Sequence, residues 1–171
     1  TDPGDRVVVQ PPVYFQRRTP VQLLAVELVY NQLQKKNEHY EMDLNHLEDL
    51  FREGVKLFFL CNPHNPVGRA WSRKELLELA ALCVKYKVMV ISDEIHSDLL
   101  LFGFRHIPFA SLGEDIADLT LTCMAPSKTF NLAGLYTSVV IASNAEIRKR
   151  YEKILDVVHV GGDNILGQVA L

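Results

Sequence analysis

Polar side chains of four different kinds come directly after short apolar runs in this 171-residue sequence. The side chains are Tyr14, Asn65, Asp93 with His96, and Lys128, and they follow the runs 6–10, 56–60, 87–91 and 119–123. An aromatic ring, an amide, a carboxylate with an imidazole and an amine therefore occupy similar positions after four separate segments. Together they could bind a flat, charged ligand and transfer protons.

The segments between these runs have the pattern of helices. The stretch 72–86 begins with Ser72 and has Glu75 three residues later, which is a capping-box start. The stretch 43–51 places its leucines on one helical face. Further strands are expected at 26–30 and 138–142, and a last helix extends to about residue 156. Apolar strands that alternate with helices predict an α/β fold, a three-layer α/β/α arrangement around a mostly parallel sheet.

A parallel sheet explains why the four kinds of side chain could act together. Ligands in open α/β sheets bind beyond the carboxyl ends of the strands. Each side chain alone also has an ordinary structural interpretation. Tyr14 could cover the edge of the core, Asn65 could form a turn with the proline that follows it, and Asp93 could cap a helix. His96 could be a structural histidine, and Lys128 a solvated lysine in a turn.

Pyridoxal phosphate is the cofactor whose chemistry uses this set of groups. Its aldehyde needs a lysine amine for a Schiff base. Its ring nitrogen must stay protonated for the ring to act as an electron sink, and a nearby carboxylate favours that state. Its phenolic oxygen accepts a hydrogen bond from an amide, and its flat ring stacks on an aromatic side chain.

Four motifs carry a resemblance to a known family. They are VVVQPPVYF (7–15), LCNPHNPVGRAW (60–71), VISDEIHSDL (90–99) and APSKTFNLAGL (125–135), and the intervening YEMDLNHLE (40–48) fits as well. The sequence resembles the fold-type I pyridoxal-phosphate enzymes of the class I/II aminotransferase superfamily. Within it the sequence is most similar to the MalY/PatB-type cystathionine β-lyases, which are C–S lyases. The segment 16–25 fits this family poorly.

The resemblance implies a role for each candidate residue. Lys128 would hold the cofactor as a Schiff base and would take the Cα proton of the substrate. Asp93 would bind the pyridinium nitrogen, Asn65 would donate to the phenolic oxygen, and Tyr14 would stack on the ring.

Two more residues are candidates for the cofactor site, and two positions differ from the pattern that is common in the family. By the same resemblance, His96 would lie near the phenolic oxygen, where many relatives have a tyrosine, and Ser127 would contact the phosphate. Many aminotransferases have an arginine where this sequence has Tyr136, which favours the lyase branch and leaves phosphate binding less well defined. Ala125 stands where a serine is common.

The resemblance also implies how much of an enzyme the chain represents. Residues 1–171 are expected to form part of the large cofactor-binding domain, without the family's N-terminal phosphate loop and without the small C-terminal domain whose arginine binds the substrate carboxylate. This chain alone is therefore expected to have little activity. The intact protein is expected to be a homodimer.

Three functions remain open at this point. The first is a C–S β-lyase that releases a thiol, pyruvate and ammonia from a sulfur-containing amino acid. The second is a class I/II aminotransferase, which uses the same lysine, aspartate, asparagine and aromatic ring. The third is a non-catalytic interaction or structural domain.

Composition excludes several other classes of protein. The net charge is −3 and no basic block is present, which argues against nucleic acid as a partner. No apolar run reaches the length of about 18–20 residues that spans a bilayer. No CxxC or HxxxH pair indicates a metal site. Cys61, Cys83 and Cys123 lie in apolar segments, as expected of buried thiols in a reducing compartment, so a cytoplasmic location is expected.

Overall fold

A six-stranded sheet forms the centre of the computed structural model, which describes residues 1–14, 25–159 and 164–170. In spatial order the strands are β2 (Glu27–Tyr30), β1 (Arg6–Val9), β5 (Leu57–Cys61), β6 (Met89–Asp93), β7 (Thr120–Met124) and β8 (Val139–Ala142). Each neighbouring pair is parallel except β7 and β8, which are antiparallel. The predicted α/β class with a mostly parallel sheet is confirmed.

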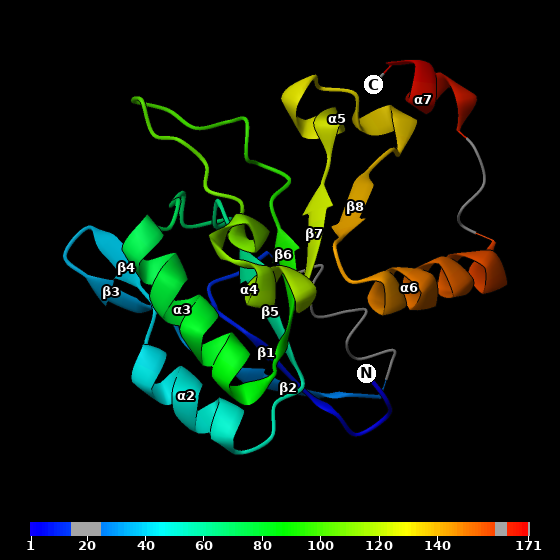
Figure 1. Ribbon diagram of the computed structural model, residues 1–171. Helices are drawn as coiled ribbons and strands as arrows, with labels where there is room; N and C mark the ends of the chain where they lie inside the picture. Colours follow the sequence, from blue (N-terminus) through cyan, green and yellow to red (C-terminus); the bar gives the residue numbers. More distant parts are fainter. Residues whose placement is uncertain (15–24, 160–163, 171) are drawn as a thin grey trace.

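Helices pack on the two faces of this sheet (Figure 1). The helices α2 (Leu44–Arg52), α3 (Arg73–Tyr86) and α4 (Glu114–Asp118) cover one face together with the short 3₁₀ helix η2 (Phe109–Leu112). The helix α6 (Ala145–Val158) lies on the other face, where burial and nearby Cys123 raise the pKa of its Tyr151 side chain. The main core therefore lies between the sheet and the first group of helices. Its largest buried side chains include Phe58, Leu60, Leu47, Leu76, Leu79 and Phe109.

The capping box at the start of α3 is present as the sequence predicts. The Ser72 hydroxyl accepts a hydrogen bond from the Glu75 N–H at 3.3 Å, and the Glu75 carboxylate accepts one from the Ser72 N–H at 2.9 Å. These bonds satisfy N–H groups that the first turn of a helix leaves unpaired. The start of α3 and the loop before it are therefore fixed to each other.

Replacing Ser72 with alanine is expected to lower the free energy of unfolding by about 1 kcal/mol, because the first turn of α3 loses its cap. Chemical denaturation monitored by circular dichroism measures the change. Ser143→Ala is the matched control, since Ser143 is exposed and lies just before Asn144, which caps α6. An equal effect of the two substitutions would contradict the capping role.

Several boundaries differ from those that the sequence predicts. The strand predicted at 87–91 is β6, which begins at Met89. Lys87 adopts a left-handed conformation (φ 54°, ψ 40°) that closes α3, and the Val88 N–H still donates to the Cys83 carbonyl, so neither residue joins the sheet. The other strands shift by one residue at their ends. The poorly fitting segment 16–25 lies outside the described residues, apart from Ala25.

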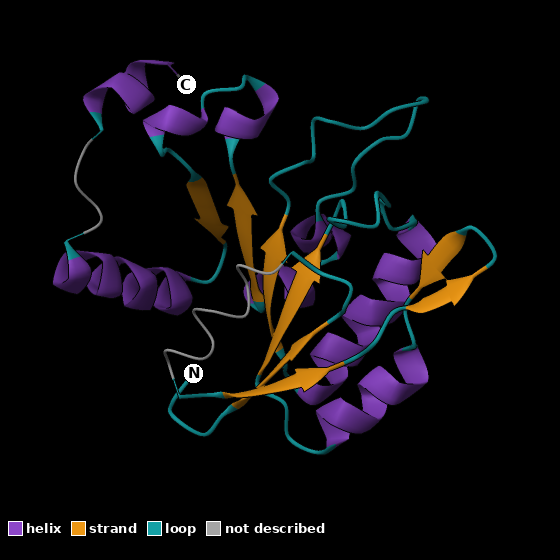
Figure 2. Cartoon of the chain, turned by 180° about the vertical axis from the view of Figure 1, so that it is seen from behind, coloured by secondary structure: helices purple, strands orange, loops and turns teal. Residues whose placement is uncertain are grey.

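The structure also contains a small antiparallel hairpin that the apolar pattern of the sequence does not predict. It consists of β3 (Gln34–Lys36) and β4 (His39–Glu41), and it lies beside α3 (Figure 1, Figure 2). Asn37 turns the chain with φ 53°, and Lys36 pairs with Glu41 at 2.6 Å. All three residues of β3 are exposed, so apolar periodicity could not reveal the strand.

Short helical segments follow β7. They are α5 (Pro126–Thr129), the 3₁₀ helix η3 (Ala133–Leu135) and, near the end of the chain, α7 (Ile165–Ala170). All three lie beyond the carboxyl end of β7, at the same edge of the sheet as the long connection from β6 to η2 (Figure 1).

Candidate active site

The ends of three central strands are level with one another. Asp93, the last residue of β6, pairs with Cys61 of β5 on one side and with Cys123 of β7 on the other. Beyond this register, the Asn62 N–H donates to the Asp93 carbonyl at 3.0 Å, and the Glu94 N–H donates to the Cys123 carbonyl at 2.9 Å. The segments that carry Asn65, Asp93 and Lys128 therefore all leave the sheet at one edge.

Asp93 lies on the face of the sheet opposite to α3. Burial alternates along β6, so that Val90 and Ser92 face the core while Asp93 is only partly buried. Its Oδ1 accepts a hydrogen bond from the Ile95 N–H at 3.2 Å. The carboxylate thus stabilises the turn that follows the strand through a cap-like hydrogen bond, although no regular helix begins there.

Asn65 is held by the backbone and thiol groups of the strand ends. The Cys61 thiol donates to the Pro63 carbonyl at 3.2 Å and accepts from the Asn65 N–H at 3.3 Å. The Tyr14 N–H donates to the Asn65 carbonyl at 3.2 Å. The structure therefore brings Asn65 and Tyr14 together, although 51 positions separate them in the numbered sequence.

The imidazole of His64 adds a second link between the same two segments. Its Nε2 lies 3.0 Å from the Pro12 carbonyl, and its ring packs edge-on against Trp71 at 5.7 Å. His64 is buried. The loop after β1 and the loop after β5 are thus joined by side-chain and backbone contacts.

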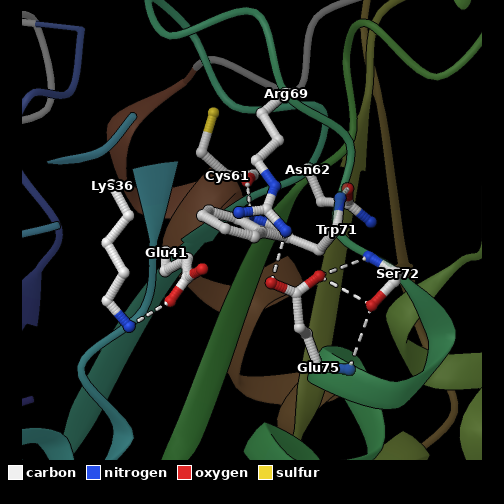
Figure 3. A network of polar contacts seen from close by, with 8 residues as sticks. All are labelled: Lys36, Glu41, Cys61, Asn62, Arg69, Trp71, Ser72 and Glu75. Atoms are coloured by element: carbon white, nitrogen blue, oxygen red, sulfur yellow. Dashed lines mark hydrogen bonds and ion pairs between the residues drawn. The ribbon is translucent and has the colours of Figure 1, made fainter. Parts of the chain in front are cut away.

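Trp71 and Arg69 connect the Asn65 loop to α3 (Figure 3). The Trp71 N–H donates to Asn62 Oδ1 at 3.1 Å, and the indole Nε1 donates to the Cys61 carbonyl at 2.9 Å. The Arg69 guanidinium lies 4.6 Å from the centre of the Trp71 ring and pairs with Glu75 of the capping box. The loop is therefore supported by the same glutamate that begins α3.

Lys128 lies on α5, directly after β7. Its N–H donates to the Ala125 carbonyl at 2.9 Å, and its side chain is exposed. The neighbouring Thr129 hydroxyl donates to Asp98 Oδ2 at 2.8 Å. This bond links the lysine segment to the turn after β6 that carries His96, which is partly buried.

Ser127 and Tyr136 complete the residues that the sequence singles out in this segment. Ser127 is partly buried, and its carbonyl accepts from the Leu132 N–H at 2.9 Å. Tyr136 is 93% exposed in a left-handed conformation (φ 47°). Its side chain therefore extends into solvent and does not cover the lysine segment.

Other candidate kinds of site receive no support from the part of the chain that the structure describes. No group of histidine, cysteine and acidic side chains there could hold a metal ion. No helix in residues 1–14, 25–159 and 164–170 has the length and apolarity needed to cross a membrane. A hollow of about 700 Å³ between α3 and α4 is lined by none of the predicted site residues.

Sequence reasoning missed the supporting residues of this edge. The sequence indicates only that Cys61 is a buried thiol, whereas its sulfur also holds the Asn65 loop. Burial does raise the pKa of the Cys83 thiol, which keeps it protonated as expected of a buried core cysteine. Glu94 is buried directly after Asp93, and only the alternation from Val90 through Ser92 could have placed it on the core face.

Removing the Cys61 thiol is expected to loosen the Asn65 loop. Cys61→Ala eliminates both sulfur hydrogen bonds and should lower the free energy of unfolding by about 1 kcal/mol. Hydrogen–deuterium exchange of peptides covering residues 62–68 should become faster. Cys83→Ala, another buried thiol, is the control that should leave this loop unchanged, and equal exchange in the two variants would contradict the role of Cys61.

Comparison with known proteins agrees with this arrangement. The sequence profile of the family described as aminotransferase class I and II matches residues 1–171. The chain belongs to this family. Cystathionine beta-lyase PatB of Bacillus subtilis is 47% identical over 172 residues, an alignment that covers 100% of this chain and 44% of the relative.

Two further relatives show how wide the family is. The crystal structure of the PLP-bound C–S lyase from Staphylococcus hominis superposes with a TM-score of 0.91 and 34% identity, over 99% of this chain and 42% of that one. Kynurenine–oxoglutarate transaminase 3 of Rattus norvegicus is 33% identical over 141 residues, covering 78% of this chain and 31% of the relative. The chain thus spans less than half the length of these relatives. The family that the motifs indicate is confirmed, and its members include both lyases and transaminases.

Proposed function

We propose that the protein containing this chain is a pyridoxal-phosphate-dependent C–S β-lyase acting on a sulfur-containing amino acid such as cystathionine. The observation that carries the proposal is the level register of β5, β6 and β7. It brings the segments that carry an amide (Asn65), a carboxylate (Asp93) and an amine (Lys128) to one edge of the sheet. The similarity to cystathionine beta-lyase PatB and to a PLP-bound C–S lyase supports the reaction and the cofactor.

The chemical groups carried by the segments at this edge are of the types that pyridoxal phosphate needs. The exposed amine of Lys128 can bind an aldehyde covalently, and the partly buried carboxylate of Asp93 can bind a protonated ring nitrogen. Asn65 offers an amide donor, and Tyr14, next to it, offers an aromatic face. When bound, the cofactor supplies an electron sink for the negative charge that develops at the substrate Cα.

The proposed work of the protein groups is proton transfer and orientation. Lys128 Nζ takes the proton from the substrate Cα, and its place on α5, bonded through Thr129 to Asp98, keeps the amine near the edge of the sheet. The Asp93 carboxylate keeps the ring nitrogen protonated. Since the Ile95 N–H already fixes Oδ1, the carboxylate needs little reorganisation to do so.

The remaining groups would orient the bound ring. The Asn65 amide would donate to the phenolic oxygen, and His96 lies on the turn next to Asp93. Ser127 lies beside Lys128, where its hydroxyl can donate to the phosphate. Cleavage then needs a leaving group at Cβ, and a thiolate leaves more readily than an alkoxide because its conjugate acid has a lower pKa.

A class I/II aminotransferase is the second candidate, favoured by the transaminase among the relatives. It would use the same lysine, aspartate and asparagine. The lyase is preferred because the more similar relative is a cystathionine β-lyase and because Tyr136 replaces the arginine expected of many aminotransferases. A non-catalytic domain has no observation in its favour.

The deciding experiment supplies pyridoxal phosphate and cystathionine to the protein containing this chain, at its full encoded length. A lyase releases thiol and pyruvate in equal amounts without an added keto acid. A transaminase instead consumes a keto acid and forms the corresponding amino acid without thiol release. Absence of thiol release would overturn the lyase proposal, and keto-acid-dependent turnover would establish the alternative.

A further inference from the structure

A buried carboxylate lies directly behind the proposed cofactor residues. Glu94 is 1% exposed and follows Asp93 in the sequence. Its Oε1 accepts from the Ser92 hydroxyl at 2.7 Å and from the Phe109 N–H at 3.0 Å. Its Oε2 lies 2.6 Å from Nε2 of His106. Both oxygens of a carboxylate on the core side of the sheet are therefore satisfied.

Glu94 cannot contact a ligand that binds to Asp93. Successive side chains of a strand point to opposite faces, and Glu94 shares the core face with Ser92 while Asp93 faces the other way. A buried carboxylate destabilises a fold unless donors compensate its lost hydration. Three groups compensate the lost hydration of Glu94, and a role other than contact with the ligand must account for this buried carboxylate.

The backbone of Glu94 shows what its side chain could hold in place. Its N–H donates to the Cys123 carbonyl at the end of β7, and its carbonyl accepts from the Ser97 N–H at 2.9 Å. The first bond connects it to the strand that leads to Lys128, and the second closes the turn that carries His96. Fixing the side chain thus fixes the junction from which three of the proposed cofactor residues extend.

We propose that Glu94 is a positioning residue that, with His106 as its partner, orients Asp93 and the turn carrying His96. We call the contacts of the Glu94 side chain with Ser92, His106 and Phe109 the Glu94 anchor. It also fixes the far end of the long connection after β6, because His106 and Phe109 lie at the end of that connection and bind Glu94 at its start. The inference rests on the proposed function wherever it concerns the cofactor. The anchoring itself depends only on the contacts of Glu94.

The two oxygens of Glu94 have different partners, which makes the test selective. His106 is 11% exposed and approaches Oε2 alone, so changes at His106 leave the bonds to Ser92 and Phe109 intact. Among the described residues, Nδ1 of His106 has no hydrogen-bond partner, so Nε2 makes the contact that matters. A glutamine at this position carries an amide nitrogen in place of Nε2 and retains a donor, whereas leucine retains volume without one.

The experiment compares His106→Leu with His106→Gln in the full-length protein. Hydrogen–deuterium exchange of peptides covering residues 93–99, measured without added cofactor, should be about tenfold faster in the leucine variant, the equivalent of one lost hydrogen bond to a charged group. The glutamine variant should stay close to the unsubstituted protein.

A second measurement distinguishes a role of Glu94 in orienting Asp93 from a role in stabilising the fold alone. The pH dependence of the visible absorption of added pyridoxal phosphate should shift in His106→Leu and be restored in His106→Gln. This absorption follows the protonation of the Schiff base with Lys128, which is conjugated with the ring nitrogen that Asp93 is proposed to face. Glu48→Gln is the control, since it also removes a carboxylate contact, to Lys85 and Tyr86, but lies on α2.

Each outcome decides part of the inference. Unchanged exchange at 93–99 in His106→Leu would overturn the anchor. Faster exchange with an unchanged absorption profile would show that Glu94 supports the fold without orienting Asp93, and would overturn the positioning role. If the unsubstituted protein binds no pyridoxal phosphate, the proposed function and the orienting role fail together, whereas the exchange data still decide the anchor.

Discussion

Replacing Lys128 with alanine is expected to lower the rate of cystathionine cleavage by on the order of 10³-fold and to abolish the covalent attachment of pyridoxal phosphate. The amine has two proposed tasks, covalent attachment and transfer of the Cα proton, and alanine can perform neither. Thiol release measures the first effect. Borohydride treatment followed by mass spectrometry of the peptide containing Lys128 measures the second.

The structure indicates that this loss would not come from unfolding. Lys128 is exposed, and the hydrogen bonds of its segment described above use its backbone and the Thr129 hydroxyl, which alanine at position 128 leaves in place. Surface substitutions usually change the free energy of unfolding by less than about 0.5 kcal/mol. Lys153→Ala, on the exposed surface of α6, is the matched control and should behave like the unsubstituted protein. A Lys128→Ala variant that still attaches the cofactor would refute the assignment.

The placement of Asp93 shows how far the sequence could predict the site. Short apolar runs between helical segments predict parallel strands, and parallel strands place their following residues at one edge. The register of Cys61, Asp93 and Cys123 confirms that geometry. The roles of the side chains in binding or catalysis stay predictions, since they depend on a ligand as well as on a fold.

The supports of the site could not be predicted in the same way. Glu94 and His106 are 12 positions apart, and no regular period connects a strand end to a residue at the far end of a long loop. The Cys61 thiol acts through bonds to backbone groups, which the identity of the surrounding residues does not reveal. Local patterns specify helices and strands, whereas contacts across loops depend on how the chain packs.

Boundary errors have a similar local cause. The strand expected from residue 87 begins at Met89 because Lys87 closes α3 in a left-handed conformation, which a lysine adopts only rarely. A glycine at that position would have indicated the helix end. The one-turn helix α5 has too few residues to show a period, so the sequence indicated only a turn around Lys128.

Asp93→Asn is expected to reduce kcat/KM for cystathionine by about 10²–10³-fold, the size of effect seen when one preorganised electrostatic contact is removed. Asparagine has the same shape and keeps an oxygen that can accept from the Ile95 N–H, so the turn after β6 should remain. What is lost is the negative charge that favours a protonated ring nitrogen. Attachment of the cofactor to Lys128 should persist, because that bond uses a different group.

This pairing of a lost rate with retained attachment distinguishes Asp93 from a residue that only shapes the site. Asp43→Asn is the matched control: Asp43 Oδ1 also accepts a backbone hydrogen bond, from the His46 N–H at 3.0 Å, but it caps α2 away from the strand ends. Asparagine caps helices about as well as aspartate, so stability should be almost unchanged. If Asp93→Asn keeps the full rate, the carboxylate does not face the ring nitrogen. If it loses both rate and attachment while the fold stays intact, the charge of Asp93 contributes mainly to binding the cofactor, and the acidity of the Cα proton must be controlled by another group at the same edge.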